Sequence, residues 1–130
     1  MVRILGGALA GAVTWFVVVS ILDLGLRYAW PDYHAVEKDM LFTVPMMIAR
    51  LTESGISSII GGYVAALIGR NKYQSSLISG VILLIPFGYF HLFVIFAKFP
   101  PWYHATFLIS LVVLSMLGGS LMKRRRVFAS

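Results

Sequence analysis

The sequence contains no cysteine and few charged residues. The absence of cysteine excludes disulfides, thiolate nucleophiles and zinc–sulfur sites. Charged residues make up only 12% of the 130 residues, whereas hydrophobic residues make up 59%. Soluble domains have about twice that share of charge and less apolar content. The composition therefore predicts an integral membrane protein.

Four apolar stretches are each long enough to cross a bilayer as a helix, which takes roughly twenty residues. They cover residues 4–26, 41–68, 76–97 and 102–122. Between the first two, a short interfacial helix is expected at about 32–39, with Asp32 as its N-cap. Only turns and a tail remain. The sequence thus predicts an all-α fold, in which residues 1–130 form a single transmembrane domain built as a four-transmembrane-helix bundle.

The basic residues predict that both termini are cytoplasmic, because cytoplasmic segments carry an excess of Lys and Arg. In this orientation the inner side collects Arg3, Arg70, Lys72, Lys123, Arg124, Arg125 and Arg126, and the outer side Arg27, Lys38 and Lys98. The run 123–126 directly follows an apolar stretch and is expected to anchor in anionic headgroups, at about 1 kcal/mol per charge. The net charge of +6 is therefore interpreted as membrane contact, without a nucleic-acid partner.

Several ionisable residues lie inside the apolar stretches, where a charge costs about 2.5–3.5 kcal/mol on insertion-based scales. The predicted topology places them in one band, within about two helical turns of the outer surface at ~1.5 Å per residue. His104 is expected at the outer rim of the band. Five hydroxyl side chains lie in or just below it: Tyr89, Thr52, Ser54, Ser57 and Ser58. The candidate ligand-binding or proton-relay residues are Arg50, Glu53, His91, Asp23, Tyr89 and Ser57.

Each of these residues also has a structural explanation. Arg50 and Glu53, three residues apart on one helix face, form an ion pair that fixes helix rotation in this interpretation. Asp23 and Arg27 satisfy each other at i and i+4. His91 acts as a lone, neutral interhelical hydrogen bonder; with no second intramembrane histidine expected, a bis-histidine haem is not predicted. The carboxylates and His91 do not have diagnostic metal spacing, so neither a cofactor nor a metal is predicted.

Small residues are spaced for close helix packing in the cytoplasmic half of the bundle. They are Gly7, Gly11, Gly62, Ala66 and Gly119. The outer half instead carries bulky methionine and aromatic side chains. We therefore expect a cup that is closed at the cytoplasmic end and open, or able to open, on the outer side.

Three short segments carry a resemblance: residues 61–66 (GGYVAA), 101–103 (PWY) and 117–121 (LGGSL). In these segments the chain resembles a group of small, uncharacterised bacterial four-helix inner-membrane proteins. The resemblance covers most of the chain and implies four helices and a location in the bacterial inner (plasma) membrane. It implies no activity.

Three classes of function stay open. The first is a binding or accessory protein, which would be a homo-oligomer or a subunit of a membrane complex. Its outer pocket would hold a lipid, a quinone-like molecule, another small apolar ligand or a partner helix. Arg50 would anchor an anionic or carbonyl group of that ligand. The second is a proton-coupled transporter of a small molecule or ion that uses Glu53 and His91. Transporters usually have several broken helices, whereas only Pro86 with Gly88 offers a break here, which favours binding. A membrane enzyme comes third, because an acid and a base are present without a nucleophile or metal motif.

Overall fold

The computed structural model describes the backbone of residues 1–70 and 73–129 and the side chains of residues 1–70 and 73–122. Lys72 and the side chains of the predicted headgroup anchor, Lys123, Arg124, Arg125 and Arg126, lie outside the described residues. The described backbone forms helices and no strands: α1 (Val2–Ala29), α2 (Pro31–Glu37), α3 (Val44–Gly69), α4 (Gln74–Tyr89), the π-helical turn η1 (Phe90–Val94), the 3₁₀ turn η2 (Phe96–Lys98) and α5 (Pro101–Ala129).

Four helical segments are long and apolar enough to cross a membrane. They are α1, α3, the continuous segment Gln74–Val94 and the part Pro101–Met122 of α5. The prediction of an all-helical chain with four apolar spans is therefore confirmed. The third segment differs from the expected span 76–97, because its α-helical part ends at Tyr89 and a π-helical turn follows.

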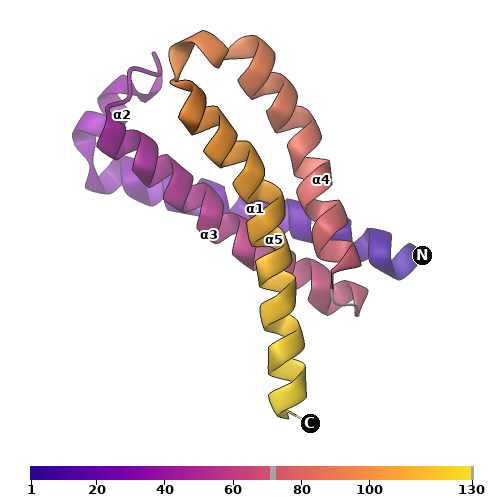
Figure 1. Ribbon diagram of the computed structural model, residues 1–130. Helices are drawn as coiled ribbons and strands as arrows, with labels where there is room; N and C mark the ends of the chain where they lie inside the picture. The colour runs from indigo at the N-terminus through magenta and orange to yellow at the C-terminus, as the bar shows by residue number, and fades with distance from the viewer. Residues whose placement is uncertain (71–72, 130) are drawn as a thin grey trace.

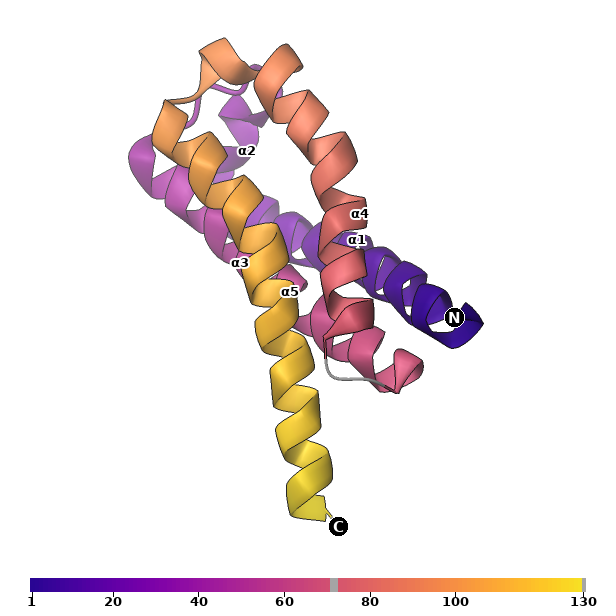
Figure 2. The same cartoon turned by 45° about the vertical axis from the view of Figure 1, so that its right-hand side comes forward.

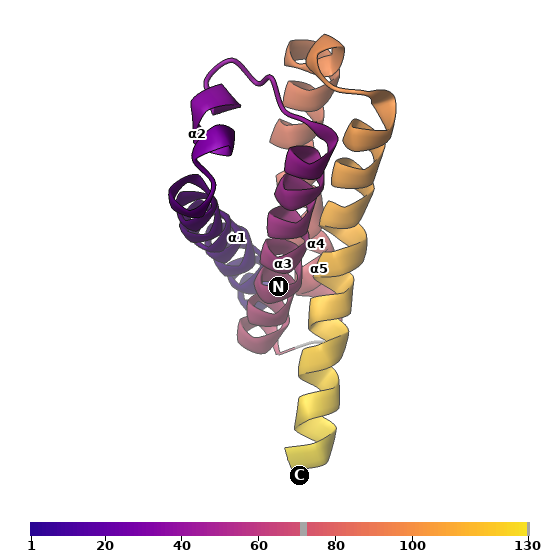
Figure 3. The ribbon, with the colours of Figure 1, turned by 90° about the vertical axis from the view of Figure 1, so that its left-hand side faces the viewer.

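Helix α3 occupies the centre of the bundle and packs against α1, α4 and α5 (Figure 1). Helices α4 and α5 run side by side, while α1 is clearly inclined to them (Figure 2). The short α2 sits at the end where α1 finishes and α3 begins, and α5 extends past the other helices at the opposite end (Figure 3). The bundle thus has one end covered by α2 and one end without such a cover.

Helix α3 begins and ends with recognisable local signals. Thr43 is its N-cap: the hydroxyl oxygen accepts a hydrogen bond from the Met46 amide at 3.5 Å, and a proline occupies the first turn. At the other end Arg70 adopts the left-handed conformation (φ 54°) that stops the helix. The predicted N-cap of α2 is wrong. Pro31 takes the first helical position, so Trp30 is the N-cap and Asp32 lies inside the first turn.

At the end opposite α2, the helix backbones touch through small residues. A Cβ placed on Gly7 would lie 2.5 Å from a carbonyl oxygen of α3, and one on Gly11 would lie 2.6 Å from another. A Cβ on Gly62 would overlap the α5 backbone, and one on Gly118 would overlap the α3 backbone. Such contact requires residues without side-chain bulk, since close approach is what holds helices together in lipid.

Of the other two small residues singled out from the sequence, Ala66 and Gly119 are both buried. Gly118, which the spacing did not single out, makes the close contact of α5 with α3. The end that carries α2 is filled differently, by a cluster of large buried side chains from α2, α3, α5 and the connections between them. This cluster contains Tyr33, Phe42, Met46, Met47, Ile95, Phe99 and Tyr103.

Candidate functional site

A cavity of about 300 Å³ lies between α1, α3, the α4–η1 segment and α5, close to α2. The four ionisable residues predicted to share a site all line it: Asp23, Arg50, Glu53 and His91. They come from three different helices, so the bundle brings together residues that are far apart in the sequence. This agrees with the single depth band expected from the sequence.

Aromatic side chains form the deeper wall of the cavity. Trp15 and Phe16 come from α1, Phe87 from α4, Phe90 from η1 and Phe107 from α5. The ring centroids of Trp15 and Phe87 are 5.0 Å apart, and those of Phe87 and Phe107 are 5.5 Å apart. These spacings lie in the preferred range for aromatic pairs. The cavity therefore has an apolar, π-rich side facing its ionisable groups.

Arg50 is held by groups of the protein itself. Its Nη1 donates a hydrogen bond to the Tyr33 hydroxyl at 2.7 Å, and its Nε donates to the Tyr103 hydroxyl at 3.2 Å. The guanidinium carbon stands 4.7 Å from the centroid of the Phe42 ring, and Nη1 lies 3.8 Å from a carboxylate oxygen of Glu37. Two of its three nitrogens, Nε and Nη1, thus have partners within the protein, whereas no partner of Nη2 is found among the described residues.

A second part of the same network joins the end of α1 to α2. Asp23 forms an ion pair with Arg27 at 2.9 Å, which confirms the pairing predicted at i and i+4. Arg27 also contacts Glu37, with 2.5 Å between Nε and Oε1. The Tyr33 hydroxyl donates to Asp23 at 2.8 Å. Burial raises the pKa of the Tyr33 phenol above its ordinary value, which keeps this donor protonated.

Glu37 and Tyr33 were not among the candidate residues, because α2 was expected to lie at the interface. Their i, i+4 spacing places them on one face of α2, and it repeats the spacing of Asp23 and Arg27 on α1. A matched pair of polar i, i+4 positions on two successive helices is the signal that sequence analysis had available. It indicates that α2 folds back onto the end of α1.

Glu53 does not pair with Arg50, so the expectation of an ion pair between them is wrong. Arg50 reaches toward α2, where Tyr33 and Glu37 take its donors, and this leaves Glu53 facing the cavity. Glu53 is only 9% exposed, and its Oε1 atom has no hydrogen-bond partner among the described residues. A buried carboxyl oxygen without a partner costs about 1–3 kcal/mol.

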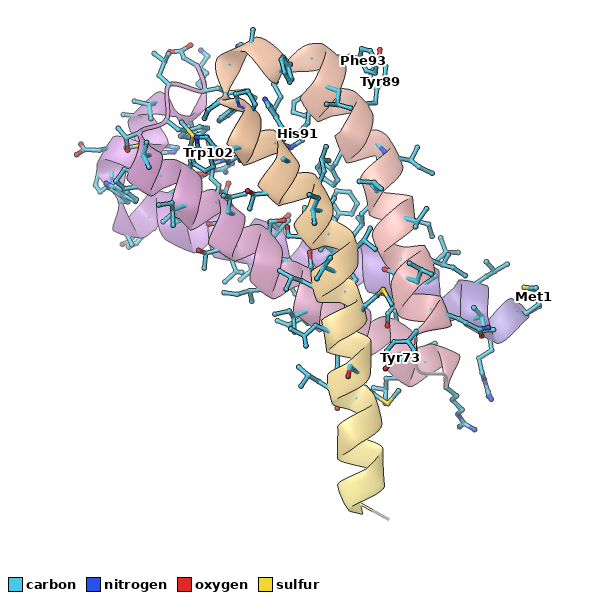
Figure 4. The ribbon with its side chains drawn as sticks, viewed as in Figure 1. Met1, Tyr73, Tyr89, His91, Phe93 and Trp102 are labelled. Carbon is cyan, nitrogen blue, oxygen red and sulfur yellow. The ribbon has the colours of Figure 1, made fainter. Side chains whose placement is uncertain are left out.

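His91 is not a lone histidine, contrary to expectation. His104, placed at the outer rim by the sequence analysis, is buried in α5, and the two Nδ1 atoms are 2.8 Å apart. Figure 4 shows His91 between the α4–η1 segment and α5. A second buried histidine is therefore present, so a bis-histidine site is no longer excluded by the lack of one. The pair is nonetheless hydrogen-bonded, because a tetrahedral metal bound by both nitrogens at about 2.0–2.1 Å would hold them roughly 3.3 Å apart.

The direction of this hydrogen bond follows from the next one. His104 Nε2 lies 3.1 Å from the backbone carbonyl oxygen of Phe96, which only accepts, so Nε2 carries the proton. In a neutral ring the His104 Nδ1 is then an acceptor, and His91 donates to it from Nδ1. His91 Nε2 is left with a lone pair. Since His91 lines the cavity, this ring is a hydrogen-bond acceptor for whatever the cavity holds.

The remaining two candidate residues lie elsewhere. Tyr89 is 66% exposed and points away from the other helices together with Phe93 (Figure 4). Ser57 is buried but donates to the backbone carbonyl of Glu53 at 2.7 Å, so its hydroxyl is used within α3. Neither residue lines the cavity. Within the described residues, no group of three or more His, Asp or Glu side chains is arranged to hold a metal ion.

Comparisons with protein-family models, with curated proteins and with solved structures find no match to this chain.

Proposed function

We propose that the protein is a membrane-embedded binding protein whose cavity holds one small, mostly apolar molecule with a polar group directed at Glu53. The observation that carries this proposal is the buried, unpartnered Oε1 of Glu53 in the wall of a cavity of about 300 Å³. The volume is at the lower end of the roughly 300–1,000 Å³ typical of small-molecule sites. A ligand that donates a hydrogen bond to Glu53, or brings a positive charge beside it, would recover the free energy lost by burying it.

The other walls suit the same kind of ligand. His91 offers a second acceptor, and the aromatic side provides apolar contact. Pockets of this type, apolar with a few convergent polar groups, are the usual form of small-molecule sites. The Arg50 network occupies the part of the lining near α2, and Oε1 of Glu53 and Nε2 of His91 are acceptors without a donor among the described residues.

Filling the cavity tests the proposal. Val19 lines it from α1, and Val17 lies on the exposed face of the same helix. In native mass spectrometry from nanodiscs we expect a co-purified small molecule on the wild-type protein and on Val17→Phe, and its loss from Val19→Phe. A Val19→Phe variant that keeps the bound mass at wild-type occupancy would remove the cavity as the binding site. The same spectra give the copy number, which tests the further proposal of a homo-oligomer or a subunit in a larger complex.

Proton-coupled transport is the second candidate, favoured by one observation. The third apolar segment changes from α-helix to a π-helical turn at Phe90–Val94, four residues after Pro86, and His91 lies in that turn. Helix breaks at mid-depth are typical of transporters, and π-helical turns occur often at functional sites. The test is proton flux into proteoliposomes: Glu53→Gln should abolish the flux seen with wild type, and equal flux in both would exclude Glu53 from such a mechanism.

We further propose that both termini face the cytoplasm in a bacterial inner membrane, on the distribution of basic residues described above. The chain lacks cysteine, so single cysteines report topology without background. Ala35→Cys in α2 should react with a membrane-impermeant maleimide on intact cells, whereas Gln74→Cys at the start of α4 should react only after permeabilisation. The reverse pattern would invert the proposed orientation.

A further inference from the structure

We propose that the cavity selects a monovalent organic cation, such as a protonated or quaternary amine with an apolar body, and that Glu53 is its counter-charge. This rests on the proposed binding function and names the class of ligand. Three features of the site lead to it: the balance of charges around the cavity, the contacts of Arg50 with the protein, and the aromatic side chains that line the same cavity as the carboxylate.

The charges around the cavity cancel except for Glu53. Arg27 is paired with both Asp23 and Glu37, and Arg50 lies beside Glu37. These two cations and two anions form one closed network between α1, α2 and α3. Glu53 remains as an additional acidic group beside the Asp23 carboxyl, and no described cation lies within ion-pair distance of it. A ligand that neutralises the ionised site therefore brings one positive charge.

An anionic ligand is disfavoured by the same network. Arg50, the cation that the sequence analysis assigned to an anionic or carbonyl group, directs Nε to Tyr103 and Nη1 to Tyr33. Its guanidinium face is covered by the Phe42 ring. Of the three Arg50 nitrogens only Nη2 is left for an anion, and an anion bound there would lie in the same cavity as the carboxyl group of Glu53. Like charges in a site of low dielectric repel strongly, so this arrangement discriminates against anions.

The aromatic wall provides the other half of a cation site. Rings from α1, α4 and α5 surround the deeper part of the cavity, and Trp15, the best cation–π partner among the side chains, is one of them. Trp15 is held in place by a hydrogen bond from its Nε1 to the Ser58 hydroxyl oxygen at 3.0 Å. A cation bound between these rings and Glu53 meets π-electron density on one side and a carboxylate on the other.

Three probes of similar size separate charge from shape: phenyltrimethylammonium, its neutral isostere tert-butylbenzene, and the anion benzenesulfonate. Binding is measured to the full chain in phosphatidylcholine nanodiscs, with empty nanodiscs subtracted, because a zwitterionic bilayer does not concentrate either ion. We expect phenyltrimethylammonium to bind at least about tenfold more tightly than either of the others, since a charge pair in a half-buried site readily supplies such a factor. This comparison uses wild-type protein only, so its outcome does not depend on whether a variant folds.

Two variants locate the effect. Glu53→Gln keeps the shape and removes the charge, so the preference for the cation over tert-butylbenzene should fall to about onefold. Asp32→Asn removes an exposed carboxylate of α2 outside the cavity and should leave the preference unchanged. Equal binding of the cation and its isostere to wild type, tighter binding of benzenesulfonate, or an unchanged preference in Glu53→Gln would each overturn the cation assignment and leave binding itself intact. Failure of all three probes, together with retention of the bound mass in Val19→Phe, would overturn the proposed binding function instead.

Discussion

The hydroxyl of Tyr33 joins the two ion-paired halves of the network, so its removal is the most direct test of that network. The Tyr33→Phe substitution keeps the ring, which stacks on Phe42, and deletes only the oxygen. Its two short hydrogen bonds disappear with it, the one donated to Asp23 at 2.8 Å and the one accepted from Arg50 at 2.7 Å, together with a weak contact to Oε2 of Glu37 at 3.4 Å. Because the buried ring stays in place, the substitution does not open a cavity where the ring packs.

The magnitude follows from these two bonds. A hydrogen bond to a charged group contributes about 1.5–3 kcal/mol, so the pair sets an upper limit of roughly 3–6 kcal/mol. Neither charge is orphaned, because Asp23 keeps Arg27 at 2.9 Å and Arg50 keeps Tyr103 at 3.2 Å. We therefore expect Tyr33→Phe to lower the free energy of unfolding by about 2–4 kcal/mol. Tyr103→Phe, which deletes only one longer bond, should cost about 1–2 kcal/mol.

The assay is reversible unfolding in mixed micelles of rising SDS fraction, followed by helix content. Tyr28→Phe is the matched control, because Tyr28 is 92% exposed at the end of α1 and makes no hydrogen bond in the described structure. The expected order of destabilisation is Tyr33→Phe, then Tyr103→Phe, then Tyr28→Phe near zero. If Tyr33→Phe and Tyr28→Phe unfold at the same SDS fraction, the network does not contribute to stability and the reasoning is refuted.

The pH dependence of the same comparison has a defined sign. Burial raises the pKa of the Tyr33 phenol above the ordinary value of 10.0, so the folded state favours the protonated form. The contribution of Tyr33 to stability is then fully present below about pH 10 and is lost as the pH rises further. The difference between wild type and Tyr33→Phe should be constant between about pH 6 and pH 9 and shrink above pH 10. A difference that grows above pH 10 would contradict this.

Two further predictions concern other parts of the bundle. Gly62→Leu places a side chain where the α5 backbone lies and should lower the free energy of unfolding by at least about 3 kcal/mol, while Gly6→Leu, at a position with open space around it, should change it by less than about 0.5 kcal/mol in the same SDS assay. For the histidine pair, the ¹⁵N chemical shifts of His91 should report a neutral ring with the proton on Nδ1, and His104→Phe should cost about 1–3 kcal/mol by leaving the Phe96 carbonyl and His91 Nδ1 without their partner. A His91 ring protonated on Nε2 alone would reverse the proposed direction of the hydrogen bond.

The helical architecture was accessible from the sequence because length and apolar content are local properties. A run of about twenty apolar residues has few alternatives in a bilayer, since every backbone group must be satisfied within the segment. Small residues at four-residue spacing likewise predict close approach, as Gly7 and Gly11 illustrate. The spacing identifies a face and not an exact register, which is why Gly118, the neighbour of the predicted Gly119, lies directly against the α3 backbone.

The partners within the site were harder to predict because they depend on connections. Depth along the helices correctly grouped Asp23, Arg50, Glu53 and His91, but depth does not say which side chain faces which. Arg50 binds to α2 only because the chain folds back after α1, and this long-range contact has no local signature at Arg50 itself. His104 meets His91 because a π-helical turn shifts the register at the end of the third segment, and single-sequence patterns do not show such a shift.

Because α1 touches α3 where Gly11 meets Gly61, a small change of helix angle at this contact moves the far end of α1 by a larger distance. A Cβ on either glycine would lie 2.6–2.8 Å from the carbonyl oxygen of the other, so the backbones of α1 and α3 are in direct contact at this point. Asp23 lies about 18 Å farther along α1 at ~1.5 Å per residue. A rotation of α1 by about 5° about its contact with α3 therefore displaces Asp23 by roughly 1.6 Å. The width of the cavity is therefore set by an angle fixed well away from it. A larger residue at Gly11 would change this angle, and with it the width of the cavity, although Gly11 does not line the cavity.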